Sequence, residues 1–253
     1  MQITENLIEK KYVAFIDVLG FKNLVETKTE KLNKYFEIVT NAIEEFKNGK
    51  FPIESQLVSD STILASNKSK EGLKHLLIAV QNIQSKCAIQ NIWLRGAITI
   101  GEIYFNSEKN IVVGKGLSDA YILETQEKFP RVIIDPKVIF DFGDIRLFCN
   151  TFNERSWNPD KRQIPLIYDY EMDIEKNLTN DAIFVSFAEK IFVDHKNHLD
   201  LIYNHLKNEM YSGQQNYAKY LWLKSYFLTT TKLMFEIEPP ENYFGFQSKL
   251  MNL

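Results

Sequence analysis

The sequence contains little cysteine and histidine, and neither residue type is arranged in a metal-binding pattern. Of the 253 residues two are cysteines, Cys87 and Cys149, which lie in unrelated segments without C-x-x-C spacing. This spacing does not indicate a zinc site or a disulfide framework, and it fits a reducing cytosol. The four histidines include no H-E-x-x-H pair. Chemistry based on thiolate or imidazole ligands is therefore not expected.

Long hydrophobic runs and an excess of one charge are also missing. No apolar run approaches the roughly 20 residues that span a bilayer, and the start "MQITENLIEKK" lacks the pattern of a signal peptide. The net charge is −3 and the isoelectric point about 5.9, which gives no bulk attraction to nucleic acid. We expect a cytoplasmic protein that binds neither DNA nor membranes.

Hydrophobic residues, 45% of the chain, are spaced in a way that predicts alternating strands and helices. The predicted order over about the first 135 residues is β-α-β-β-α-β-β-α-β. Two β-α-β halves joined through a hairpin indicate an α+β protein with a ferredoxin-like α/β sandwich. The strands are expected at 12–19, 92–105, 111–114 and 131–135, the hairpin at 55–66, and the helices at 32–46, 73–83 and 117–129.

The second half of the chain has a less regular pattern. "NERSWNPDKRQIP" reads as a loop, and helices are expected near 180–208 and 216–229. We therefore predict a domain of residues 1–138 and a mostly helical C-terminal extension, residues 139–253, packed on it.

One carboxylate interrupts the apolar stretch "YVAFIDVLGFKNLV". Burying an unpaired Asp17 costs several kcal/mol. Asp60 lies 43 residues further on, between the two arms of the hairpin, and the predicted topology places that hairpin beside the first strand. Two carboxylates that meet with no basic partner nearby predict a cation, and oxygen ligands completed by phosphate and water are typical of a Mg²⁺ nucleotide site. A pair of Mg²⁺ or Mn²⁺ ions is the usual arrangement for transfer at phosphorus.

The turn "LGFKN" directly follows Asp17. Its backbone N–H groups at the start of a helix could receive a triphosphate, and Gly20 permits a close approach. A simpler interpretation is that Asp17 caps this helix and Asp60 is an ordinary turn residue. That alternative stays open at the level of the sequence.

Four segments, in the right order, resemble the motifs of the class III nucleotidyl cyclases. "FIDVLGF" is similar to F-x-D-I-x-G-F, "QLVSDSTILA" to K-x-x-G-D with a following strand, "LRGAITIGE" to R-x-G-I-x-x-G-E, and "VVGKGLSDAYILE" to V-x-G-x-x-V-N-x-A-x-x-L-E. The resemblance covers roughly residues 10–136. It implies a palm-type fold that works as a homodimer and converts a nucleoside triphosphate to a 3′,5′-cyclic mononucleotide and pyrophosphate.

The resemblance also implies roles for individual residues. Asp17 and Asp60 correspond to the ligands of two Mg²⁺ or Mn²⁺ ions. The carbonyl of Val18 corresponds to a further metal contact, and Gly20, Phe21 and Lys22 fall on the turn that binds the triphosphate. Gln56 and Lys115 occupy the positions that read the base, and Ser118 occupies the ribose position. In such a dimer Ser118 and Lys115 face the partner's Asp17.

Two positions depart from the family pattern. Ser118 replaces the Asn that orients the ribose, and Ile122 replaces the Arg that stabilises the transition state. Losing such a cation usually costs orders of magnitude in rate, so another arginine, Arg95 or Arg131 for instance, has to take its place, or the site is slow or silent. A silent nucleotide-binding or interaction module and a palm-fold enzyme that makes oligonucleotides are therefore the alternatives.

The two base-reading positions are unlike those of adenylate or guanylate cyclases. Gln56 is neutral and offers both a donor and an acceptor, and Lys115 can donate to the carbonyl oxygen that uracil and cytosine share. This pattern resembles the bacterial pyrimidine cyclases of Pycsar anti-phage defence, whose cyclic CMP or UMP activates a separate effector. We accordingly predict a pyrimidine triphosphate as substrate, with UTP slightly ahead of CTP.

Overall fold

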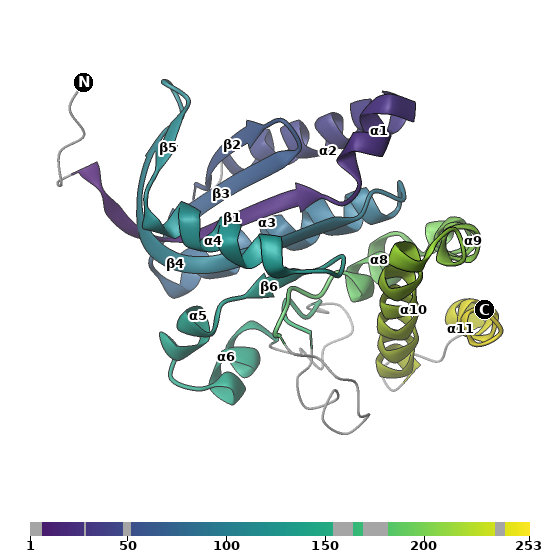
Figure 1. Cartoon of the computed structure of the whole chain (residues 1–253). Coiled ribbons are helices and arrows are strands. Elements are labelled where there is room, and N and C mark those ends of the chain that lie inside the picture. Colours follow the sequence, from purple (N-terminus) through teal and green to yellow (C-terminus); the bar gives the residue numbers. More distant parts are fainter. Residues whose placement is uncertain (1–6, 28, 48–51, 154–163, 169–181, 236–240) are drawn as a thin grey trace.

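The computed structural model describes residues 7–27, 29–47, 52–153, 164–168, 182–235 and 241–253 (Figure 1). A mixed sheet of six strands lies at its centre, in the order β2-β3-β1-β4-β5, with β6 parallel to β4. The pairs of β1 with β3 and β4, and of β2 with β3, are antiparallel. The strands are β1 (Glu9–Val18), β2 (Glu54–Val58), β3 (Ser61–Asn67), β4 (Leu94–Asn106), β5 (Ile111–Val113) and β6 (Val132–Ile134).

This order is that of a ferredoxin-like sandwich, so the structure confirms the predicted fold class. The helices that connect the strands are α1 (Phe21–Thr27), α2 (Thr29–Lys47), α3 (Lys70–Ala88) and α4 (Lys115–Gln126). α4 begins two residues earlier than the spacing predicted and ends three residues sooner. The helix predicted at 32–46 lies within α2.

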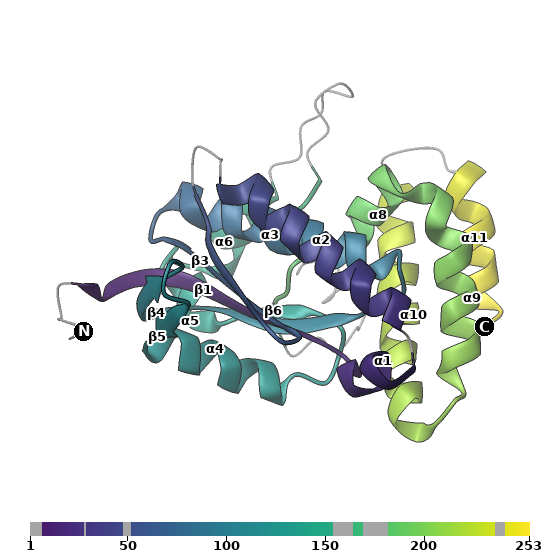
Figure 2. The ribbon, with the colours of Figure 1, turned by 90° about the horizontal axis from the view of Figure 1, so that it is seen from above.

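The side chains of β1 alternate between two cores, as a strand with both faces covered requires. Tyr12, Ala14 and Ile16 are buried in the larger core, which includes residues of α2 and α3. Val13 points to the other face and joins a smaller cluster with Ala120 of α4. Figure 2 shows the sheet between these layers, with α2 and α3 on one side and α4 on the other.

The C-terminal part of the chain adds two short helices and a second group of helices at one end of the sheet (Figure 1). Aromatic residues dominate its core, in which Phe184 packs edge to face on Tyr226 and Phe187 lies tilted against the same ring. The elements are α5 (Pro136–Phe140), α6 (Ile145–Phe152), α8 (Ala188–Asp194), the 3₁₀-helix η3 (Lys196–His198), α9 (Leu199–Met210), α10 (Gln214–Phe235) and α11 (Glu241–Met251). No described helix is long and apolar enough to cross a membrane.

The prediction of one helix over 180–208 is wrong in its first part. Ile183 and Val185 are extended, because their backbone groups pair with β6: Ile134 N donates to the Ile183 carbonyl at 2.7 Å, and Val185 N donates to the Val132 carbonyl at 3.0 Å. Helix starts at residue 188. The structure also has helix beyond 216–229 and the additional α11, which the sequence pattern did not indicate. The predicted loop at 153–165 falls mostly outside the described residues, and the domain boundary at 138 stays a prediction.

Candidate active site at the end of the first strand

The centre of the site is the turn that leads from β1 into α1. Gly20 has φ +77°, a left-handed conformation that glycine adopts without strain. Before it, Leu19 N donates to the Trp93 carbonyl at 2.9 Å, and after it Leu24 N donates to the Gly20 carbonyl at 3.3 Å. These bonds fix the chain on both sides of the turn, so the backbone at residues 20–22 has a defined position next to Asp17.

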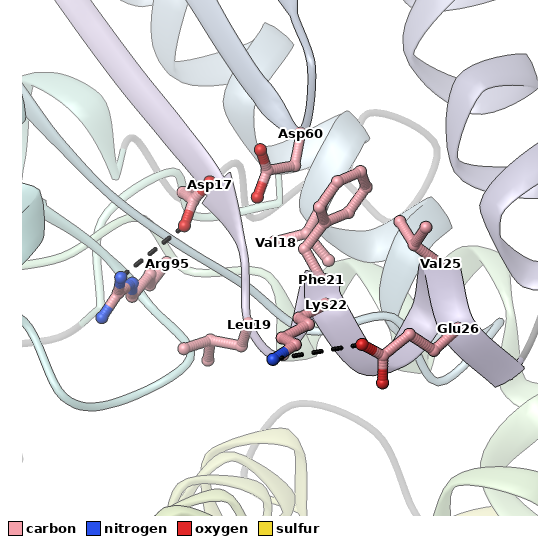
Figure 3. Close-up of a pocket in the computed structure, with 10 residues that line it drawn as sticks. Asp17, Val18, Leu19, Phe21, Lys22, Val25, Glu26, Asp60 and Arg95 are labelled. Carbon is pink, nitrogen blue, oxygen red and sulfur yellow. Dashed lines mark ion pairs between the residues drawn. The ribbon is translucent and has the colours of Figure 1, made fainter.

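Asp17 and Asp60 face each other beside this turn (Figure 3). Asp17 lies one residue before the end of β1, and Asp60 lies in the tight turn between β2 and β3. Ser61 Oγ donates to Asp17 Oδ1 at 3.2 Å. The buried Tyr35 of α2 donates its hydroxyl to the Asp60 carbonyl at 2.6 Å. A helix, a strand and a hairpin thus hold the two carboxylates together.

The electrostatics of this pair favour uptake of a positive charge. The pKa of Asp17 is raised above its usual value, first because the side chain is buried and second because of the neighbouring charge of Asp60. Arg95 and the hydroxyl of Ser61 act in the opposite direction without cancelling the effect. Two adjacent carboxylates resist full ionisation unless a proton or a cation joins them.

The prediction that no basic group lies near the carboxylates is wrong. Arg95 Nη2 lies 3.6 Å from Asp17 Oδ2. The two residues are Cα partners in the antiparallel pairing of β1 with β4, although 78 residues separate them in the sequence. The register of the sheet brings them together, and the local sequence around Asp17 does not contain this information.

The carboxylates, the turn and Arg95 line one pocket of about 640 Å³. It is an open depression with two cationic side chains, Lys22 and Arg95, and a partly apolar wall. Lys22 is exposed and lies 4.0 Å from Glu26. The lining residues are Asp17, Val18, Leu19, Gly20, Phe21, Lys22, Val25, Glu26, Asp60 and Arg95. Seven of the residues expected from the sequence, Asp17, Val18, Gly20, Phe21, Lys22, Asp60 and Arg95, therefore share this pocket.

The donor set of the pocket fits a divalent metal ion with oxygen ligands. Asp17 and Asp60 supply carboxylate oxygens, which Mg²⁺ and Mn²⁺ prefer. Among the described residues no group of three or more His, Cys, Asp or Glu side chains forms a complete metal cage. Sites that hold Mg²⁺ through one or two carboxylates leave the other positions to water and to substrate phosphates.

Three further predicted site residues lie away from this pocket. Lys115, at the start of α4, forms an ion pair with Asp119 at 2.6 Å. Ser118 is exposed, and its Oγ lies 3.4 Å from the Gly114 carbonyl. Gln56 Nε2 donates to the Asn110 carbonyl in the turn between β4 and β5 at 3.2 Å.

The course of α4 explains this separation. The start of α4 lies against Gly101 of β4, and its last turn reaches Arg95 through Glu124. Nine residues of helix between Lys115 and Glu124 span about 13 Å. Within one chain, Lys115 therefore lies at the end of α4 opposite the carboxylates.

Arg131 is not placed to replace a transition-state arginine. Its side chain is buried, forms an ion pair with Glu127 at 2.9 Å, and lies over the rings of Phe129, Phe184 and Trp222 at 5.3 to 5.6 Å. This arginine therefore packs against the aromatic core of the C-terminal part of the chain. Ile122 has half of its surface exposed on α4.

Sequence reasoning missed three residues that support the site: Tyr35, Ser61 and Glu124. Tyr35 and Ser61 sit in an apolar helix pattern and a polar turn, where nothing distinguishes them from ordinary neighbours. Glu124 carried a signal, since it is the acidic end of the fourth cyclase-like motif. Its buried contact with Arg95 depends on the packing of α4 against β4.

No model of a protein family matches the chain, and no curated protein matches it. Among solved structures, a bacterial light-regulated adenylyl cyclase aligns with 17% identity over 52% of this chain and 78% of its own, with a TM-score of 0.40. The guanylate cyclase domain of RhGC from Catenaria anguillulae in complex with GTP aligns with 13% identity, 53% and 82% coverage and a TM-score of 0.40. The adenylyl cyclase CyaB from P. aeruginosa gives 16% identity, 50% and 76% coverage and a TM-score of 0.37. About half of this chain lies outside each alignment.

Proposed function

We propose that the chain is a metal-dependent nucleotide cyclase. The observation that carries this proposal is the meeting of Asp17 and Asp60 at one pocket whose other wall is the turn at residues 20–22. The pKa of Asp17 is raised, first by burial and then by Asp60, and a bound cation would offset both the burial of the charge and the repulsion between the two carboxylates. The four motifs of the sequence support the same activity, because the residues they would assign to metal and triphosphate are those that share the pocket.

In this proposal Asp17 and Asp60 hold the metal ions, with the Val18 carbonyl as a further contact. Mg²⁺ or Mn²⁺ bound there would neutralise the triphosphate and acidify the attacking hydroxyl. The backbone of Gly20 and Phe21, with the ammonium group of Lys22, receives the β- and γ-phosphates. The 3′-hydroxyl oxygen bonds to the α-phosphorus, the bond from that phosphorus to the pyrophosphate oxygen breaks, and the hydroxyl proton passes to water.

The proposed active form is a homodimer. Lys115 and Ser118 lie in the first turn of α4, outside the pocket that holds the carboxylates of their own chain. In a dimer of the class III type these residues contact the nucleotide held by the partner's Asp17. Gln56 and Lys115 would then read a pyrimidine base, with UTP slightly ahead of CTP, and the cyclic product would act on a separate effector in anti-phage defence.

Incubation of the protein with Mn²⁺ and each of the four nucleoside triphosphates, followed by chromatography, tests the proposal. We expect a cyclic mononucleotide and pyrophosphate in equal amounts, most from a pyrimidine triphosphate. Linear or cyclic oligonucleotides would instead indicate the palm-fold alternative. Bound but unreacted nucleotide with all four substrates would contradict the cyclase.

A catalytically silent nucleotide-binding module is the second candidate, and a specific observation favours it. Ile122, which is 51% exposed on α4, stands where the motif has its arginine. Because isoleucine is uncharged, this position supplies no cation. A silent module would bind nucleoside triphosphate through the same pocket, and substitution of Asp17 would lower that binding without any product to lose.

A further inference from the structure

Arg95 contacts the last turn of α4 as well as Asp17. Its Nε lies 2.5 Å from Oε1 of Glu124, and its Nη1 donates to the Glu127 carbonyl at 3.3 Å. Both oxygens belong to the C-terminal end of the helix, where the helix dipole favours a cation. The side chain of Glu124 is 2% exposed and that of Arg95 is 28% exposed, so the anchoring contact is buried while the guanidinium reaches the pocket.

The anchored guanidinium stops short of Asp17. At 3.6 Å, Nη2 is close enough to offset the charge of the Asp17 carboxylate but too distant for a hydrogen bond. Arginine frequently forms two parallel hydrogen bonds with a carboxylate, because its planar group matches the carboxylate geometry. Here two such groups, Asp17 and Asp60, lie within the same pocket, so something has to keep the guanidinium from occupying the space between them.

We infer that Glu124 is a positioning residue that restrains Arg95 and thereby leaves the carboxylates of Asp17 and Asp60 open to a divalent cation. With Glu124 in place, Arg95 shares its charge between Glu124 and Asp17. Without the charge of Glu124, Arg95 turns toward Asp17 and Asp60 and competes with the metal for their oxygens. This inference rests on the proposed metal site, and it concerns the affinity of that site.

The test measures Mn²⁺ binding to the full chain without nucleotide, from the electron paramagnetic resonance signal of free Mn²⁺. For E124Q, which keeps the size of the side chain and removes its charge, we expect about tenfold weaker binding. In the R95M background the competing cation is absent, and we expect the substitution E124Q to have no further effect. E124D restores the charge and should recover part of the affinity.

The double-mutant comparison separates positioning from a direct effect of charge. If E124Q weakens Mn²⁺ binding as much in R95M as in the wild-type chain, Glu124 acts without Arg95 and the inference is overturned. An unchanged affinity of E124Q in the wild-type background overturns it as well. Should E124Q fail to fold, as judged by circular dichroism, E124A, which also removes the charge, makes the same comparison with and without R95M.

Asp135 provides a matched control. It is a buried carboxylate that accepts from Thr99 Oγ1 at 2.6 Å and from Lys137 N at 2.9 Å. Thr99 is four residues from Arg95 on β4, about 13 Å along the strand. D135N should lower thermal stability and leave Mn²⁺ binding unchanged. The proposed function fails if the wild-type chain does not bind Mn²⁺, or if D17A binds Mn²⁺ as well as the wild-type chain does. In contrast, normal Mn²⁺ binding by E124Q, with wild-type binding abolished by D17A, overturns only the role of Glu124.

Discussion

Replacing Asp17 with asparagine should stabilise the metal-free protein at neutral pH. The carboxylates of Asp17 and Asp60 contact each other, and two charges roughly 4 Å apart repel by about 4 kcal/mol at an effective dielectric constant of about 20. Arg95, 3.6 Å from Asp17, offsets about the same amount. What remains is the cost of burying a charge on a side chain that is 18% exposed, about 1 to 2 kcal/mol after partial solvation.

The sign of the pH dependence follows from the pKa shift. The folded-state pKa of Asp17 is raised, through burial first and Asp60 second, so ionisation of Asp17 destabilises the fold. This destabilisation is fully present above the folded pKa, decreases as the pH falls through it, and is absent below the unfolded value of about 3.9. The advantage of D17N in unfolding free energy should therefore be largest at pH 7 to 8 and vanish near pH 4.

Thermal unfolding followed by circular dichroism, with and without Mn²⁺, measures both effects. For a chain of this size 1 kcal/mol corresponds to about 2 to 4 °C in Tm. Wild-type protein at a hundred times the Kd of Mn²⁺ should gain about 2.7 kcal/mol, whereas D17N should gain little. A D17N variant that is less stable than wild type at pH 7.5 without metal, or that is stabilised by Mn²⁺ to the same extent, would refute the reasoning.

Asp141 is the control of opposite sign. Its burial opposes ionisation, but Lys68, 2.9 Å away, and the Tyr12 hydroxyl, which donates at 3.0 Å, lower the pKa of Asp141. Its charge therefore stabilises the fold above the unfolded pKa. D141N should reduce Tm at neutral pH and lose that difference as the pH falls through the folded pKa.

The remaining predictions concern activity, specificity, assembly and the C-terminal core. Asp60→Ala should abolish product formation while circular dichroism shows a folded chain, and near-full activity with Mn²⁺ would remove the two-ion assignment. Gln56→Ala should keep turnover but lose base selectivity in a four-nucleotide assay, whereas an unchanged preference would place the reader elsewhere. Light scattering should show a dimer at the concentrations that support turnover; a monomer with normal turnover would contradict a shared site. Tyr226→Phe should cost about 1 to 3 kcal/mol of unfolding free energy. The reason is that the Tyr226 hydroxyl accepts from the backbone N–H groups of Phe187 and Ala188 at 2.9 and 3.0 Å. A loss below about 0.5 kcal/mol in chemical denaturation would show that other groups satisfy these two N–H groups.

The first half of the fold was readable from the sequence because its elements have strong local periodicity. The strand at 12–19, the hairpin around Asp60 and the helix through Leu73 and Leu76 each bury a face that the spacing of apolar residues reveals. The C-terminal half was harder to read. Ile183 and Val185 are extended because β6 offers them an edge to pair with, and that edge exists only in the folded chain.

The sequence by itself determined that Asp17 lies in an apolar strand, that a glycine turn follows it, and that Asp60 lies in the hairpin turn. These are local properties of spacing and turn chemistry. The tertiary structure decided what surrounds the carboxylates, since the register of β1 with β4 places Arg95 opposite Asp17 and the packing of α4 places Glu124 behind that arginine. Contacts between residues 17, 95 and 124 depend on strand pairing and helix docking over long separations, and short-range sequence patterns do not encode them.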